Sequence, residues 1–173
     1  MAWSAGFRLG VALVALGSLA GCSAAAPGVD PTTPGPLTRV QAGQLVDAAL
    51  DDLIAVLDAR ADAPDLRRTA EPTIRSDGQC FYDSARYAAS ERPTEEHWDV
   101  LAEAAEPTVR KLGMEPSAGW SGPERSTGGG LIARSPANGA EFRARSTAEP
   151  GSDPGDYAGI ELGFTIPLAA EEC

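Results

Sequence analysis

The chain has little metal-binding chemistry and few aromatic side chains. Its 173 residues include one histidine and three cysteines, and aromatic residues make up 6% of the sequence. A structural zinc site needs roughly four nitrogen or sulfur ligands, often with Cys-x-x-Cys spacing, and the chain offers neither. No apolar run reaches the about 20 residues that span a bilayer as a helix. We therefore expect no metal ion, no cofactor and a small, filled core.

Positive charge is also scarce. Fourteen basic residues stand against 25 acidic ones, which gives a formal net charge of −11 at pH 7. Binding to nucleic acid or electrostatic docking on anionic lipid requires a basic face. The composition therefore disfavours both, and we predict no nucleic-acid partner.

Catalytic motifs are missing as well. Gly119–Pro123 resembles a nucleophile elbow but fails the GxSxG spacing. Gly128–Gly130 lacks the lysine and helix of a P-loop, and Asp153–Asp156 lacks the spacing of a calcium loop. His97 could act as a general base, but the sequence marks no serine or cysteine partner for it. We predict no catalytic residue and no enzymatic activity. A pair of catalytic carboxylates of the glycosidase type stays open, because the geometry of such a pair cannot be read from the sequence.

What the chain does have is a targeting segment. Arg8 precedes Leu9–Leu19, which contains only Leu, Val, Ala, Gly and Ser. This length matches the apolar core of a signal peptide, about 7 to 15 residues. The small pair Ala20-Gly21 follows, and Cys22 comes directly after it.

The run Leu19-Ala20-Gly21-Cys22 resembles the lipobox of bacterial lipoprotein precursors. The resemblance implies that residues 1–21 are a signal peptide and that Cys22, acylated with diacylglycerol, becomes the first residue. Two acyl chains suffice for stable anchoring. We therefore expect a lipid anchor on the extracytoplasmic face of the cell membrane; the alternative is an unmodified cysteine. Abundant Arg, Ala, Gly, Pro and Asp make the chain similar to small actinobacterial lipoproteins of unknown function.

Residues 22–37 are predicted to be a tether. Most are Ser, Ala, Pro, Gly and Thr, a composition that cannot bury enough apolar surface to fold. The remaining residues, 38–173, suit a single domain. With Cys22 lipidated, Cys80 and Cys173 are the two thiols left in an oxidising compartment, so we predict that they form a disulfide. Two unpaired buried thiols are the alternative.

Two amphipathic helices are expected. Thr38 and Gln41 form a capping box before apolar residues at helical spacing, which predicts a helix over 38–60. The polar stretch 62–71 ends it. Thr94 caps a second helix that Gly113 stops, and Pro107 should kink or split that helix.

The strands are expected mostly late in the chain. Residues 73–87 carry strand-forming side chains around an Asp77-Gly78 turn. Residues 131–134 and 140–146 are expected to form a hairpin, and a strand near 117–122 would add to the sheet. Residues 157–166 form the clearest strand, because apolar residues at the even positions 160–166 alternate with other residues. The predicted fold is α+β in the order αβαβββ, with both helices on one face of an antiparallel sheet.

Three functions stay open from the sequence. The first is a non-enzymatic envelope module that binds a protein or a cell-wall component through its sheet face or loops. The second is a carrier that encloses a hydrophobic ligand in a cavity, and the third is a cell-wall hydrolase that uses acids and His97. The absence of a catalytic motif favours the first.

Overall fold

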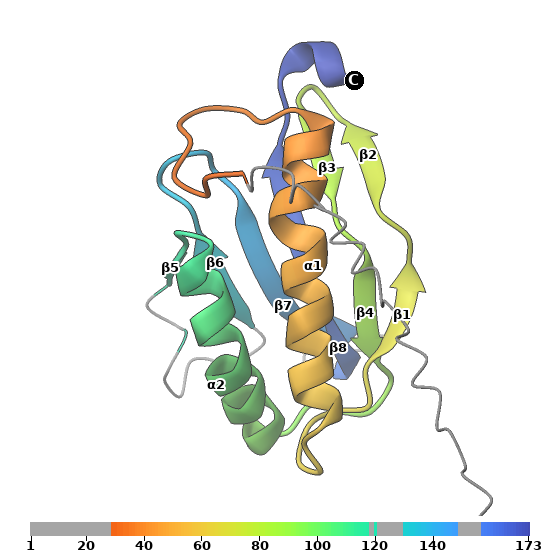
Figure 1. The fold of residues 1–173 in the computed structure, drawn as a ribbon. Coiled ribbons are helices and arrows are strands. Elements are labelled where there is room, and N and C mark those ends of the chain that lie inside the picture. The colour runs from red at the N-terminus through yellow and green to blue at the C-terminus, as the bar shows by residue number, and fades with distance from the viewer. Residues whose placement is uncertain (1–28, 118–119, 121–129, 149–156) are drawn as a thin grey trace, which may run out of the picture.

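The computed structural model describes residues 29–117, 120, 130–148 and 157–173. The fold is α+β, with two α-helices and an antiparallel sheet of eight strands in the described part (Figure 1). The elements are α1 Arg39–Asp58, β1 Arg67–Ala70, β2 Thr73–Ser76, β3 Cys80–Asp83, β4 Arg86–Ala89, α2 Glu95–Lys111, β5 Glu115–Pro116, β6 Leu131–Arg134, β7 Glu141–Ala148, β8 Tyr157–Pro167 and the short 3-10 helix η3 Ala170–Glu172.

Strand β8 is the centre of the sheet. It pairs along one edge with β7 and along the other with both β3 and β4, so the sheet runs β1-β4-β8-β7-β6-β5 with β2 and β3 added beside β8. Ser84 and Ala85 separate β3 from β4. The Ser84 hydroxyl accepts a 2.9 Å hydrogen bond from the Phe164 N–H, which keeps this interruption attached to β8.

Both helices lie in front of the sheet in Figure 1. Helix α1 begins at the predicted capping box, since the Thr38 hydroxyl accepts from Gln41 N–H and the Gln41 side chain accepts from Thr38 N–H. Helix α2 is one helix with Pro107 inside it, so the predicted split is wrong. Ala105 and Val109, on either side of Pro107, are at most 1% exposed, and their packing holds the helix together across the missing backbone bond.

The alternation predicted for the late strands is confirmed. Phe142 and Ala144 of β7 are at most 2% exposed, as are four residues of β8, and all of them join the helices in one hydrophobic cluster. The four residues of β8 are Ile160, Leu162, Phe164 and Ile166. Phe142 lies between Phe164 and Trp120, with ring centroids 5.1 and 6.0 Å away. One face of the sheet is therefore filled with side chains.

The early strands are more numerous than predicted. The predicted Asp77-Gly78 turn joins β2 to β3, but the order αβαβββ counted one strand where β2, β3 and β4 are found. Strand β1 lies within the polar stretch that was expected to hold no strand. All four residues of β1 are exposed at the sheet edge, so no apolar alternation marks it. Of the strand considered near 117–122, only Ser117 and Trp120 are described, and neither is in a strand; β5 lies just before them.

The segment Asp30–Leu37, here called the strap, lies against the domain although it was predicted to be tether. Asn138 Nδ2 donates to the Pro31 carbonyl (3.2 Å), and Gly35 N–H donates to the Ala137 carbonyl (3.0 Å). Leu37 is 1% exposed and bridges to Leu168 near the chain end. The contacts of the domain therefore begin at the strap rather than at residue 38.

The chain end is fixed by Cys80 and Cys173, which form a disulfide with Cα atoms 5.7 Å apart, in agreement with the predicted pair. Beside it, Leu168 N–H donates to the Cys80 carbonyl, and the Glu172 carboxylate accepts from Arg39 N–H at the start of α1. The strap, the C-terminal tail and the first turn of α1 are thus joined at one end of the molecule.

Candidate functional site

The candidate site is the face of the sheet opposite the core residues, here called the open face. Along β7, Glu141, Arg143 and Arg145 alternate with the buried Phe142 and Ala144, so they lie on this face. The register places Thr165 opposite Glu141, Gly163 opposite Arg143 and Glu161 opposite Arg145.

A half-open hollow of about 390 Å³ lies on the open face. Strands β2, β3, β4, β7 and β8 all contribute to it. The lining residues are Arg75, Phe81, Asp83, Arg86, Gly139, Glu141, Arg143, Arg145, Glu161, Leu162, Gly163, Phe164 and Thr165.

Asp83 is the most buried charged group of the hollow. One of its carboxylate oxygens accepts from the Thr165 hydroxyl (2.8 Å). The other accepts from Arg75 Nε (3.1 Å) and lies 3.7 Å from an Arg86 guanidinium nitrogen. The bond to Asp83 raises the pKa of Arg75, which keeps this guanidinium charged. Asp83 thereby fixes two arginines from different strands.

The other two carboxylates are also paired with arginines. Glu161 accepts from Arg86 (3.2 Å) and from Arg145 (3.1 Å). Glu141 accepts from Arg134 (2.6 Å) and from Arg143 (2.5 Å). Every carboxylate of the hollow therefore has two arginine partners.

The charges are layered by depth. The side chains of Asp83, Glu141 and Glu161 are 3%, 17% and 24% exposed, whereas the arginine side chains that line the hollow are 39% to 49% exposed. The carboxylates form the floor and the guanidinium groups form the rim. A ligand that enters the hollow meets arginine first.

Gly163 keeps the floor low. A Cβ atom at this position would lie 3.2 Å from the Ala85 carbonyl oxygen and 3.4 Å from the Ser84 hydroxyl. The first of these contacts is tighter than ordinary van der Waals packing, so a side chain here would need the backbone at Ser84 and Ala85 to shift.

His97 is part of a helix cap. Its backbone N–H donates to the Thr94 hydroxyl (3.2 Å), and its Nδ1 accepts from the Thr94 N–H (3.4 Å). This is a capping box with histidine in the usual position of glutamate. The geometry gives His97 a structural role at the start of α2, and His97 is not among the residues that line the hollow.

The remaining sequence candidates lie largely outside the described residues. Cys22, Asp153–Asp156 and most of Gly119–Pro123 and Gly128–Gly130 fall there. Trp120 is described and is 4% exposed, and Gly130 has a φ of +68° where a Cβ would collide with the backbone of β7.

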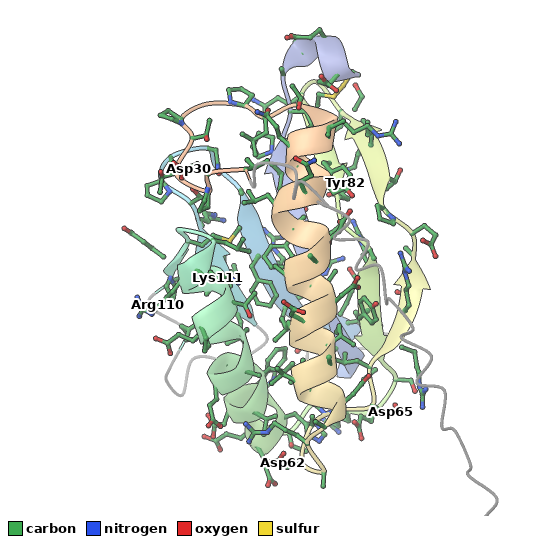
Figure 2. All side chains as sticks on the ribbon, in the orientation of Figure 1. Asp30, Asp62, Asp65, Tyr82, Arg110 and Lys111 are labelled. Atoms are coloured by element: carbon green, nitrogen blue, oxygen red, sulfur yellow. A yellow bond between two sulfur atoms is a disulfide. The ribbon has the colours of Figure 1, made fainter. Side chains whose placement is uncertain are left out.

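A second polar cluster lies on the helix side of the sheet. The Tyr82 hydroxyl donates to Asp47 Oδ2 (2.7 Å), while Asp47 Oδ1 is buried without a hydrogen-bond partner among the described residues. Burial raises the pKa of Asp47, against the opposing effect of the Tyr82 bond, and burial also raises the pKa of Tyr82. Tyr82 lies beside α1 in Figure 2. No pattern in the sequence marks this pair.

Within the described residues, no three or more His, Cys, Asp or Glu side chains are grouped so as to hold a metal ion. None of the described helices is long and apolar enough to cross a membrane. Comparison with family models, curated proteins and solved structures finds no match. The site must therefore be interpreted from its own geometry.

Proposed function

We propose that the protein is a lipid-anchored envelope module that binds a partner through its open face and carries out no catalysis. In this proposal the lipid on Cys22 holds the module at the cell membrane. The two amphipathic helices cover one face of the sheet, and the other face is left for the partner. The observation that carries the proposal is the layer of half-exposed arginines over less exposed carboxylates.

The binding function is favoured over the hydrolase because of how the carboxylates are paired. A glycosidase needs one protonated carboxyl group as acid and a second carboxylate as base or nucleophile. Asp83, Glu141 and Glu161 are instead each paired with two arginines, so their oxygens are already engaged by the protein. Their role is better described as orienting the guanidinium groups.

The binding function is also favoured over the carrier. A site for a hydrophobic ligand should be lined mostly by apolar side chains. The hollow on the open face is lined mainly by charged residues, and a larger one of about 650 Å³ beside β1 and β4 is lined by Asp65, Arg67, Glu91 and smaller, mostly polar residues. The aromatic residues of the core pack on one another.

The strap shortens the proposed tether. Its hydrogen bonds to the rest of the domain begin at Pro31, which leaves residues 23–30 between Cys22 and the first of these contacts. In this proposal fewer residues therefore separate the lipid from the domain than a tether over residues 22–37 would supply.

The test compares two variants in cells. Cys22→Ser should release the protein from membranes, since the acylated thiol is lost, whereas Arg143→Glu with Arg145→Glu should leave it in the membrane fraction and abolish co-purification of its partner. Detergent partitioning and cross-linked co-purification measure the two effects. Membrane retention of a fully processed serine variant would refute the lipid anchor, and unchanged co-purification by the glutamate variant would refute binding through the open face.

A further inference from the structure

We infer that the open face binds an anionic polysaccharide-type polymer, whose phosphate or carboxylate groups are held by Arg75, Arg86, Arg143 and Arg145. This inference rests on the proposed function and names the ligand class for the same face. It is argued from charge, hydrogen-bond donors, the span of the arginines and the absence of apolar anchors.

The charge of the hollow differs from that of the chain as a whole. The chain carries a net charge of −11, yet the exposed layer of the hollow consists of arginines while the carboxylates lie beneath them. A polyanion is repelled by most of the protein surface at long range. Within the hollow it meets guanidinium groups, so binding should be local and should weaken as salt screens it.

The arginines have donors to spare. A guanidinium group carries five N–H donors, and it binds phosphate or carboxylate through two of them at once. Arg143 and Arg145 each use one terminal nitrogen on a floor carboxylate, and Arg86 uses its two terminal nitrogens on two different carboxylates. Arg75 uses Nε on Asp83 and one terminal nitrogen on Asp77, which leaves its second terminal nitrogen. The remaining N–H donors can bind an oxyanion that enters the hollow from solvent. The floor carboxylates hold the arginine side chains in place before the ligand arrives.

The arginines are spread over a length that suits a polymer. Arg75 is on β2 and Arg143 is on β7, with β3 and β8 between these strands. Three strand spacings amount to about 14 Å. A single phosphate or carboxylate covers a fraction of that distance, whereas a chain with repeated negative groups can contact several arginines at once.

A protein partner would need apolar anchors, and the open face offers few. Protein interfaces centre on buried aromatic and aliphatic side chains. In the described part of the chain the exposed large hydrophobic residues are Val40 and Val56, both on α1. Phe81 lines the hollow but is covered by Arg75, whose guanidinium carbon lies 4.6 Å from the ring centroid. The surface therefore suits a hydrophilic ligand better than an acidic protein.

The test uses the full lipidated chain, purified in detergent, and titration calorimetry with four probes. Polyphosphate supplies phosphate groups, polygalacturonate supplies carboxylates on a sugar chain, neutral dextran lacks charge, and polyglutamate represents an acidic protein. We expect polyphosphate or polygalacturonate to bind and dextran not to bind. The affinities of the two anionic polymers then tell which oxyanion the face prefers.

The test variant is Arg143→Met with Arg145→Met. It removes two rim charges, but Glu141 keeps Arg134 and Glu161 keeps Arg86, so no floor carboxylate loses all its partners. The matched control is Arg110→Met with Lys111→Met, which removes the same charge at the end of α2 (Figure 2). We expect polymer affinity to fall at least tenfold in the rim variant and less than twofold in the control.

The outcomes separate this inference from the proposed function. Tighter binding of polyglutamate than of both anionic polymers would overturn the inference in favour of an acidic protein partner. Failure of every polyanion to bind, together with a co-purified partner that the rim variant loses, would overturn the ligand class and leave the binding module standing. Equal affinity of wild type and rim variant for the polymers would remove the open face as their site.

Discussion

The two faces of the central strands differ although they share one backbone. Toward the helices, β7 and β8 present Phe142, Ala144, Leu162 and Phe164, all at most 2% exposed. On the open face, the residues between them in sequence include arginines that are nearly half exposed. Because successive side chains of a strand point to opposite faces of the sheet, the same two strands form part of the filled core on one face and part of the charged hollow on the other.

The difference shows how stability and binding are divided in this protein. Burial of apolar side chains is the main stabilising contribution to a fold, and it lies on the helix side. Exposed ion pairs contribute little, about 0 to 1 kcal/mol each. The half-exposed arginines of the open face can therefore be changed at small cost in stability, which is what a surface that evolves toward a ligand requires.

The largest effect is expected on the helix side. Phe142→Ala should lower the free energy of unfolding by about 3 to 5 kcal/mol, because it leaves a cavity between Trp120 and Phe164. Urea unfolding followed by circular dichroism measures the change. Its neighbour Arg143→Met should cost less than about 1 kcal/mol, since it removes one half-exposed ion pair. Comparable losses from the two substitutions would show that the open face is structural.

Loss of the disulfide should cause the next largest decrease in the free energy of unfolding. Cys80 and Cys173 are 93 residues apart in sequence, and the bond restricts the unfolded chain over that whole loop. Replacing both cysteines by serine should cost about 2 to 4 kcal/mol. Thermal unfolding with and without reductant measures this.

The variant without the disulfide also tests whether the core side of the sheet and the open face are independent of each other. Cys80 is buried in the core cluster while its neighbour Phe81 lines the hollow. Below the unfolding transition, the serine variant should therefore keep its polymer affinity within about twofold. Loss of binding by a variant that is still folded would mean that the covalent bond shapes the open face.

The sequence predicted the elements whose burial is one-sided. Strand β8 shows its period-two pattern over its whole length, and the capping box at Thr38 marks the start of α1. Strand β1 could not be found in this way because both of its faces are exposed. The strap was also missed, since its contacts come from Asn138 and Leu168, which are distant in sequence.

The candidate site could be predicted only in part. Alternation alone places Arg143, Arg145 and Glu161 on the side away from the apolar residues. Their ion pairs depend on the register of β7 against β8, and the position of Arg86 depends on the interruption at Ser84 and Ala85. Neither the register nor the interruption leaves a local signal in the sequence.

The smallest effect concerns an acid on the apolar side. Asp47 is bonded to Tyr82 through one oxygen, while its other oxygen is buried without a hydrogen-bond partner among the described residues. Burial raises its pKa above the ordinary value of 3.8. A carboxyl group with a raised folded pKa stabilises the fold below its unfolded pKa, and this contribution is lost as the pH rises through the folded value. At neutral pH, the charged Asp47 is therefore a cost.

Asp47→Asn should remove that cost and keep the bond, because the amide oxygen can still accept from the Tyr82 hydroxyl. At pH 7 we expect the free energy of unfolding of the variant to equal that of the wild type or to exceed it by no more than about 1 kcal/mol. The advantage should shrink as the pH falls through the raised pKa of Asp47, because the carboxyl group then becomes neutral. Asp83→Asn is the matched comparison on the open face. It should lower stability at neutral pH, since Arg75 and Arg86 lose a buried partner. Urea unfolding of both variants between pH 3 and pH 7 measures these changes, and a loss of stability in Asp47→Asn at pH 7 as large as that in Asp83→Asn would contradict the contrast between the faces.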